Sequence, residues 1–215
     1  MAAPPPWWRT TERRATTFDG WVVRDGAYFS ASFDPGPVGL RTPTAAEPDL
    51  ALAPLGAAAG VRVAGVGRER LLVPVASRAA LAALDPDLDG LRDACDRLGL
   101  PGAYVHSPPS PTGGLAARMF APSIGVPEDI ANANGTTRVA ALLARRGTTR
   151  IAVDMGDAVG SPATITATAR PGPSGVRIRV GGAPPRPPGS EWPVARRPDR
   201  LSGVIDRRRP CCSKA

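Results

Sequence analysis

The chain has 215 residues, of which 42% are apolar and 21% charged, a composition typical of a soluble globular protein. Its apolar runs fall well short of the roughly 18 residues that a membrane-spanning helix needs. Residues 1–15 also lack the apolar core of a secretory signal. We therefore expect neither a membrane protein nor an exported one, and predict a cytoplasmic protein.

The net charge of +8 is concentrated at the two ends of the chain. Residues 184–215 hold seven Arg and one Lys against three acids, and residues 1–15 hold three Arg against one acid, which leaves only +1 for residues 16–183. Proteins that bind nucleic acid carry basic residues on a structured face with aromatic groups for stacking. We therefore expect no specific nucleic-acid partner, and predict that the Pro- and Arg-rich ends, 1–15 and 184–215, are disordered.

The first predicted structure is a β-hairpin within residues 16–44. Trp21 to Val23 and Ala27 to Phe33 are strand-like, and Asp25-Gly26 between them tolerates the positive φ of a tight turn. Apolar residues alternate with Tyr and Ser in the second arm, which predicts one buried face. Residues 41–49 are predicted to be a linker.

The next predicted elements are a second hairpin and an amphipathic helix. Val61 to Val66 and Leu71 to Val75 are short apolar runs on either side of a polar turn at 68–70. The helix is expected to begin at Asp85, as its cap, and to end at Gly99. Its apolar residues lie at spacings of three and four, so they share one face: Leu88, Leu91, Cys95 and Leu98. We therefore predict that the Cys95 thiol is buried and unreactive.

The central prediction is a helix from about Gly135 to Arg146, capped by Asn134, whose body is apolar on nearly all sides. A helix of this kind is enclosed by the rest of the fold. Further short strands are predicted at 103–106, 116–120, 150–154, 165–169 and 176–180. Residues 50–183 thus predict an α+β unit in which a curved β-sheet or barrel surrounds a central apolar helix.

The start of this helix is the candidate binding site. The first turn of a helix has unpaired backbone N–H groups and the positive end of the macrodipole, so it attracts anions such as a carboxylate. Gly135, Thr136 and Thr137 would occupy that turn with small side chains, and Asp129 lies just before it. Asp129 is expected to accept a hydrogen bond from a substrate amine or hydroxyl, and Asn134 to contact the substrate or cap the helix. The alternative is an ordinary acidic turn before a capped helix.

The sequence shows no metal-ligand spacing. Cys95 belongs to an apolar helix face, Cys211 and Cys212 are adjacent in the tail, and the single histidine, His106, has no partner pattern. We therefore predict no metal site.

Two segments resemble the PhzF family of phenazine-biosynthesis-like isomerases. The family pattern of the first is Phe-Ala-Pro, a Gly-containing turn, and Glu-Asp-Pro-Ala-Thr-Gly-Ser. Within residues 118–137 it is matched in order by Phe120-Ala121-Pro122, Gly125, Glu128-Asp129 and Ala131. Residues 155–163 keep both glycines and the proline of the family's Gln-Gly-x-x-Met-Gly-Arg-Pro-Ser. The resemblance covers roughly residues 16–183.

The resemblance implies a diaminopimelate-epimerase-like fold, with two similar lobes and an active site in the cleft between them. Residues 50–183 would form the second lobe, and residues 16–44 an incomplete remnant of the first. Characterised members move a proton along a small carboxylic acid without a cofactor, using a carboxyl group as general base and then general acid. By position, the substrate-binding residues implied here are Asp129, Asn134, Gly135 and Thr136.

The catalytic side of the family pattern is not matched in this sequence. The family's proton-shuttling Glu and its Gly-His pair belong to the first lobe, and neither Glu12 nor His106 stands in a corresponding place. We therefore assign no catalytic residue and expect a truncated or mis-started isomerase polypeptide without measurable activity of its own. The alternative is a non-catalytic module of the same fold that binds a small acid. Trp21, Phe29 and Phe33 are expected to leave an apolar face exposed, which predicts either poor solubility or a homodimer formed through that face.

Overall fold

The structure, a computed structural model, describes residues 17–25, 28–57, 60–172, 175–182 and 199–204. Its strands are β1 (Thr17–Asp25), β2 (Tyr28–Phe33), β3 (Gly39–Arg41), β4 (Arg62–Val66), β5 (Arg68–Pro74), β6 (Ala103–His106), β7 (Gly114–Ala121), β8 (Val126–Asp129), β9 (Arg150–Met155), β10 (Ala163–Gly172), β11 (Gly175–Gly182) and β12 (Asp199–Val204). Its helices are α1 (Ala46–Leu55), α2 (Arg78–Ala82), α3 (Leu88–Leu98) and α4 (Ala133–Ala144), with short 3-10 helices η2 (Pro122–Ile124) and η3 (Asp157–Val159). Within the described residues, no helix is both long and apolar enough to cross a membrane.

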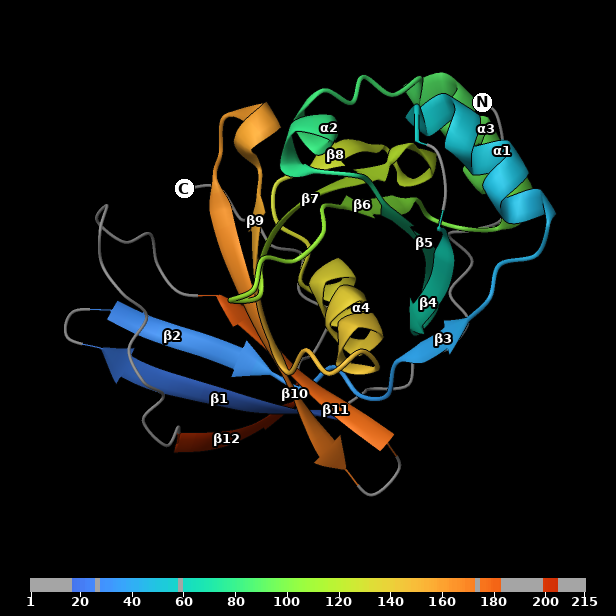
Figure 1. The fold of residues 1–215 in the computed structure, drawn as a ribbon. Helices are drawn as coiled ribbons and strands as arrows, with labels where there is room; N and C mark the ends of the chain where they lie inside the picture. The colour runs from blue at the N-terminus through green and yellow to red at the C-terminus, as the bar shows by residue number, and fades with distance from the viewer. Residues whose placement is uncertain (1–16, 26–27, 58–59, 173–174, 183–198, 205–215) are drawn as a thin grey trace, which may run out of the picture.

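The strands form one curved sheet that wraps around α4 (Figure 1). Neighbouring strands follow the order β12-β1-β2-β11-β10-β9-β7-β6-β5-β4-β3, and β8 pairs with β7 beside this path. The pairs β5–β6 and β7–β9 are parallel, whereas the hairpins are antiparallel. Because β3 and β12 are the two ends of this order, the sheet curves around the helix without closing into a barrel.

The predicted enclosed helix is confirmed. Val139, Ala140, Ala141 and Leu143 of α4 are at most 5% exposed. They belong to one apolar cluster with inward-facing side chains of the surrounding strands, such as Leu72, Leu115, Val153 and Ile178. The burial of this helix on several sides explains why its sequence has no polar stripe.

A second apolar layer lies on the outer face of the sheet, under α1 and α3 (Figure 1). Leu71 and Val73 of β5 face this layer, whereas Leu72 between them faces α4, because side chains alternate along a strand. Leu91 and Cys95 of α3 complete the layer, and both are fully buried. The predicted burial of Cys95 is therefore confirmed. Burial also raises the pKa of its thiol to about 11, which disfavours the reactive thiolate.

Several predicted boundaries are wrong. The linker at 41–49 runs into α1, whose Glu47 is buried and accepts hydrogen bonds from Arg41 and the Thr44 amide. The β4–β5 turn lies at Gly67, which has a φ of 75°, so the polar residues 68–70 belong to β5. The helix predicted from Asp85 begins at Leu88 with Asp87 as its cap, because the Asp87 carboxylate accepts from the Gly90 amide at 3.0 Å.

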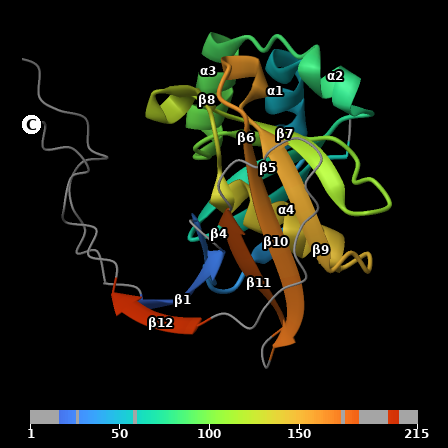
Figure 2. The same cartoon turned by 90° about the vertical axis from the view of Figure 1, so that its left-hand side faces the viewer.

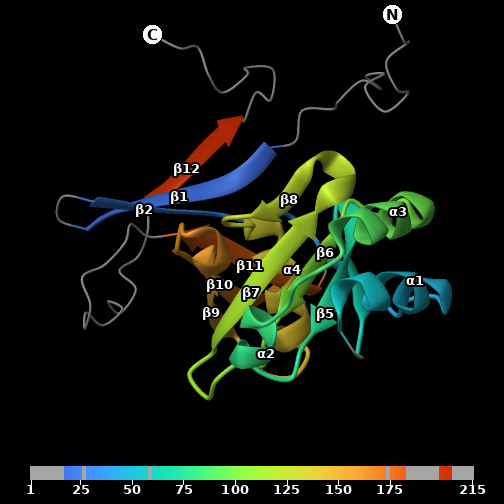
Figure 3. The same ribbon diagram turned by 90° about the horizontal axis from the view of Figure 1, so that it is seen from above.

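The β1–β2 hairpin forms as predicted and projects from the lobe on the side away from α1 and α3 (Figures 2 and 3). Its buried face is only partial: Phe33 packs against the α4 cluster, but Phe29 is 61% exposed. Trp21 pairs with Ser32 across the hairpin, so it lies on the opposite face from Phe29 and Phe33 and contacts Arg179 instead. The expectation that all three aromatic residues share one face is therefore wrong.

Within the two chain ends predicted to be disordered, the structure describes only residues 199–204. Residues 199–204, inside the tail expected to be disordered, form β12 and pair antiparallel with β1. Residues 1–15 and the rest of 184–215 lie outside the described residues.

Candidate functional site

The two acids before α4 have different environments, because β8 turns them to opposite sides. Glu128 forms a bidentate ion pair with Arg118 of β7, with N–O distances of 2.9 and 2.7 Å. The Arg118 guanidinium also donates to the Leu84 carbonyl at 2.7 Å and lies over the Phe120 ring. Both side chains of the pair are nearly buried, at 13% and 11% exposed. The Glu128–Arg118 pair therefore connects β8 to β7 and, through the Leu84 carbonyl, to the α2–α3 connection.

Asp129, by contrast, points to the start of α4. Its Oδ2 accepts a hydrogen bond from Nδ2 of Asn132 at 2.8 Å, and Oδ1 of Asn132 accepts from the Gly135 amide at 2.6 Å. Asn132 has an extended backbone, with φ −122° and ψ 91°, and is the N-cap of the helix. The predicted cap, Asn134, is wrong: that residue lies inside the first turn, where its helical backbone prevents capping, and its side chain is exposed.

The first turn of α4 still has donors without an acceptor inside the helix. The Asn132 side chain takes the Gly135 amide, and the Thr136 amide donates to the Asn132 carbonyl at 3.0 Å, as the first helical bond. The amides of Ala133 and Asn134 precede that bond, so the helix itself offers them no partner. These two amides lie next to the Asp129–Asn132 pair.

Tyr104 of β6 closes the inner side of this turn. Its hydroxyl is 3.0 Å from Oγ1 of Thr136, and a Cβ on Gly135 would lie 2.1 Å from the Tyr104 ring. Gly135 is therefore required by close packing. Burial raises the pKa of Tyr104, so its hydroxyl stays protonated. Of the predicted substrate contacts, Asp129 and Asn134 are at least partly open to solvent, whereas Gly135 and Thr136 are buried beneath Tyr104.

The second family-like segment meets the first at this helix start. Met155 Sδ lies 3.5 Å from the Asn132 amide and accepts from the Tyr104 hydroxyl at 3.4 Å. Gly156 has a φ of 82°, and a Cβ there would lie 2.1 Å from the Ser161 carbonyl oxygen and 3.0 Å from that of Ile130. The glycine thus lets the β9–η3 loop pack directly against the β8–α4 loop. The two segments that carry the resemblance form one structural unit.

The family model for phenazine biosynthesis-like proteins (PhzC-PhzF) matches residues 43–184. The chain belongs to this family. The match covers both segments around the start of α4.

Individual relatives agree with this assignment. A curated protein described as an uncharacterized isomerase, from Deinococcus radiodurans, is 32% identical over 84 residues, which are 39% of this chain and 27% of that protein. The PhzF-family phenazine biosynthesis protein of Bacillus anthracis aligns with a TM-score of 0.63 at 12% identity, over 80% of this chain and 66% of the other. A predicted epimerase from Pseudomonas aeruginosa aligns with a TM-score of 0.58 at 26% identity, over 75% and 57%. The expected PhzF-type fold is confirmed, and the chain spans less than two thirds of each of these relatives.

Two arginines that the motifs do not include lie beside the helix start of this PhzF-family chain. Arg70 of β5 is on the same strand face as Leu72, which packs in the α4 cluster, and its Nη1 donates to Asn132 Oδ1 at 3.3 Å. Arg138 of α4 is 2% exposed, and its Nη2 donates to the Arg68 carbonyl at 2.8 Å. Burial, and to a smaller extent the charge of Arg70, lowers the pKa of Arg138 to about 10. Burial also lowers the pKa of Arg70, while the charge of Asp129 opposes this effect.

These two arginines were missed because motif spacing does not point to them. The available signals were a charged residue two positions before Leu72 in an inward-facing strand and another directly before the apolar run of α4. Neither signal says that Arg70 and Arg138 come together, since 68 positions of sequence separate them and only the packing of β5 against α4 joins them.

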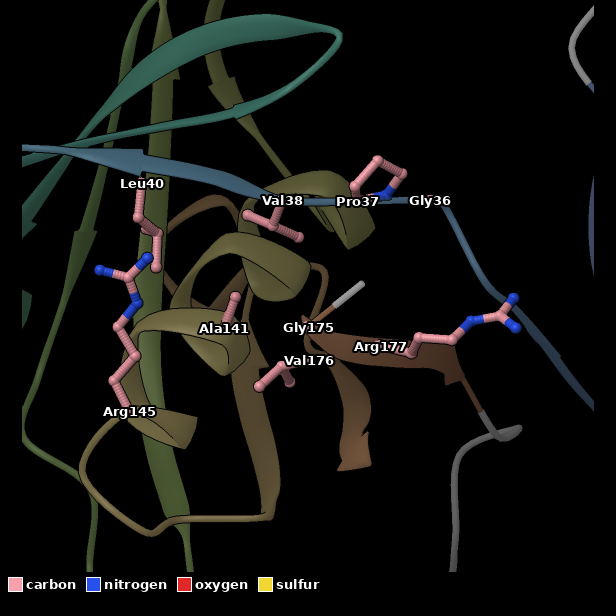
Figure 4. Close-up of a pocket in the computed structure, with 9 residues that line it drawn as sticks. All are labelled: Gly36, Pro37, Val38, Leu40, Ala141, Arg145, Gly175, Val176 and Arg177. Atoms are coloured by element: carbon pink, nitrogen blue, oxygen red, sulfur yellow. The ribbon is translucent and has the colours of Figure 1, made fainter. Parts of the chain in front are cut away.

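A separate pocket of about 450 Å³ lies farther along α4 (Figure 4). Between Ala141 of α4 and the helix C-cap Arg145, it is lined on one side by Gly36, Pro37, Val38 and Leu40 and on the other by Gly175, Val176 and Arg177. Arg177 donates to Asp34 at 2.7 Å and points away from Ala141 in Figure 4. Ala141 and Arg145 lie in later turns of α4 than Asn132, so this pocket is not the family-like site.

The described residues include no group of three or more His, Cys, Asp or Glu side chains arranged to hold a metal ion. Loops from the two family-like segments instead expose apolar side chains, since Ile130, which follows Asp129 in the sequence, is 46% exposed and Val159 of η3 is 45% exposed. The site therefore combines a partly exposed carboxylate, helix-start amides and one adjacent exposed apolar residue, Ile130.

Proposed function

We propose that this chain is a PhzF-type isomerase polypeptide whose α4 site holds a small carboxylic acid for a proton shift between carbons, without a cofactor. The relative described as an isomerase and the structure described as a predicted epimerase support this class of reaction. The observation that carries the proposal is the Asp129–Asn132 pair at the start of α4, where the backbone amides of Ala133 and Asn134 have no acceptor within the helix. Asp129 accepts from a substrate hydroxyl or amine, while Asn134 and the amides face the acid group.

Asn132 gives this arrangement its orientation. Its side-chain Nδ2 donates to Asp129, and its side-chain Oδ1 accepts from both the Gly135 amide and Arg70. The Asp129 carboxylate is therefore held beside the helix start by a side chain that the helix itself fixes. Gly135 and Thr136 contribute through the helix start, not through side-chain contact, because Tyr104 covers them.

For this chain alone we propose binding without measurable turnover. A proton shift needs a carboxyl group that takes a proton from one carbon and returns it to another, and such catalysis supplies about 10²–10⁴-fold in rate. Glu128 is engaged by Arg118, and Asp129 is engaged by Asn132. These fixed partners also favour the second candidate, a non-catalytic module that binds a small acid at the same place.

Calorimetry with lactate and propionate tests the binding site. These acids have similar size, but only lactate carries a hydroxyl for Asp129. We expect tighter binding of lactate, and a loss of about 10-fold or more in Asp129→Asn, because a hydrogen bond to a charged group is worth roughly 1.5–3 kcal/mol. Asp96→Asn, on the exposed side of α3, is the matched control and should bind as the original chain does.

A second measurement tests whether this chain turns over the acid that it binds. Lactate is incubated with the protein in D2O and its α-hydrogen is followed by NMR, since a proton shift exchanges that hydrogen with solvent. Binding without exchange fits the small-acid-binding module and the prediction for this chain alone. Exchange that Asp129→Asn abolishes would show catalysis in the chain itself, whereas equal binding by Asp129→Asn and the original chain would remove the proposed site.

A further inference from the structure

The N–H groups of the Arg70 and Arg138 guanidiniums outnumber the acceptor atoms that the surrounding protein offers them. Arg138 Nε and Nη1 and Arg70 Nε are buried without a hydrogen-bond partner. An arginine carries five N–H donors, yet Arg138 is bound by one backbone carbonyl and Arg70 by one amide oxygen. Arg138, at 2% exposure, is also among the largest fully enclosed side chains of the chain.

No carboxylate of the described residues forms an ion pair with either group. The ion pairs of that part of the chain use Arg41, Arg78, Arg92, Arg118 and Arg177. Asp129 is the acid whose charge acts on Arg70, and its carboxylate is bonded to Asn132. Buried charges are normally paired with an opposite charge, so this part of the fold has two cations and lacks a bonded anion.

We propose that Arg70 and Arg138 hold the anionic group of the ligand, a carboxylate or a phosphate. This inference rests on the proposed function, because it adds Arg70 and Arg138 to the helix-start amides as partners of the same acid group. Guanidinium groups suit it because their planar N–H edges match the oxygens of these anions.

The charges around Asn132 then define the class of ligand. Asn132 contacts Asp129 through its NH2 group and Arg70 through its oxygen, so the negative and positive sides of the site are separated by one amide side chain. A ligand that fits both sides has a hydrogen-bond donor close to its acid group. This describes a hydroxy acid or amino acid better than a simple fatty acid.

Binding requires a small opening of the β4–β5 turn, because the unpaired guanidinium nitrogens are enclosed by protein atoms. The turn contains Gly67, and a Cβ there would have no neighbour within 4 Å, so this segment is loosely surrounded. Arg138 is bonded to the carbonyl of Arg68 just after it. An anion that replaces this carbonyl as acceptor would free the turn.

Thermal unfolding at constant ionic strength tests the proposal, with acetate and phosphate added in place of chloride in separate arms. We expect one or both anions to raise the Tm of the original chain by about 3–6 °C for each tenfold increase above the Kd. Arg138→Met and Arg70→Met should lose this response, and Arg138→Met should be at least as stable as the original chain without anion, because it removes an unpaired buried charge. Arg97→Met, an exposed position on α3, should respond like the original chain.

The variants also separate this inference from the proposed function. Asp129→Asn should keep the response to acetate or phosphate and lose only the preference for lactate over propionate. If that preference depends on Asp129 while Arg138→Met still responds to the anions, the arginine site is wrong and the proposed function stands. The arginine site is also wrong if neither anion raises the Tm of the original chain, and the proposed function is then judged by the lactate and propionate calorimetry alone. The arm that responds, acetate or phosphate, identifies the anion.

Discussion

Glu128 and Asp129 show how strongly a single position along a strand decides what a carboxylate does. The two residues are neighbours in the sequence, but β8 directs Glu128 to Arg118 and Asp129 to Asn132. The first pair is nearly buried and joins three parts of the fold, whereas Asp129 stays partly open beside the helix start. Their substitution should therefore have different consequences.

Glu128→Ala should lower the free energy of unfolding by about 3 kcal/mol or more, because it leaves the nearly buried Arg118 charge without its partner. Asp89→Ala removes the acid of an exposed pair with Arg92 and should leave stability almost unchanged. Urea unfolding at neutral pH measures both. Equal effects of the two substitutions would contradict a structural role for the Glu128–Arg118 pair.

His106 is the second residue with a testable consequence. It is 5% exposed, its Nδ1 is 3.0 Å from the Ser107 carbonyl oxygen, and its Nε2 is buried without a partner. Burial, and to a smaller extent the charge of Arg146, lowers its pKa, whereas the bond to Ser107 opposes this. The folded chain therefore keeps His106 neutral under conditions in which the unfolded chain protonates it.

The sign of the pH effect follows from this difference. Below the unfolded pKa of about 6.5 the unfolded state binds more protons, so stability decreases as pH falls from there towards the lower pKa of the folded state. In His106→Phe this contribution disappears, and the decline in unfolding free energy between about pH 7 and pH 5 should be shallower. Urea unfolding across this range measures it, and parallel pH dependences would show that His106 does not contribute.

At the scale of elements, the loops around α4 are placed by glycines that accept close contacts. Gly156 brings the β9–η3 loop against the carbonyl of Ile130, while Gly160, at the other end of η3, has a φ of 70° and open space around it. The two glycines therefore share a left-handed backbone and differ in packing. They form a matched pair for testing whether the contact between the two family-like segments matters.

Gly160→Ala should cost about 1–2 kcal/mol, from the left-handed backbone alone. Gly156→Ala should cost about 1–3 kcal/mol more, because its Cβ would overlap the Ser161 and Ile130 carbonyls. It should also weaken lactate binding, since Ile130 directly follows Asp129. Thermal unfolding and calorimetry measure these effects, and equal stability of the two variants would mean that the loops adjust without strain.

For the whole molecule, the β1–β2 hairpin matters because its Phe29 is the most exposed large apolar side chain among the residues whose burial the structure describes. Phe29 lies beyond the three residues of β2 that pair with β11, and Arg24 is the cation placed over its ring, at 5.9 Å. Phe33, within the paired stretch, packs against Phe18 and the α4 cluster. The exposed end of the hairpin is thus the place where we expect copies of the chain to associate.

Phe29→Ser should reduce self-association, because it removes an exposed aromatic side chain from this end. Ile124→Ser, which changes a comparably exposed apolar residue on η2, should leave self-association unchanged. Sedimentation velocity over a range of concentrations measures both. A monomer at high concentration for the original chain would contradict this expectation.

The amino-acid sequence by itself determined those features that depend on neighbouring residues. The enclosed helix followed from the apolar run at 139–144, the hairpin from Asp25-Gly26 between two strand-like stretches, and the family from motifs within residues 118–137 and 155–163. The sequence did not determine where this helix begins, because Asn132 and Asn134 can both cap a helix and only the backbone conformation selects between them.

Only the tertiary structure decided which distant residues act together. Tyr104 covers Gly135, Arg118 engages Glu128, and Arg70 comes to lie near Arg138 because β5, β6 and β7 wrap around α4. It also placed Trp21 and Phe29 on opposite faces, through the register of β1 against β2. Local patterns specify helices and turns, whereas burial and pairing of charges depend on contacts that sequence spacing does not contain.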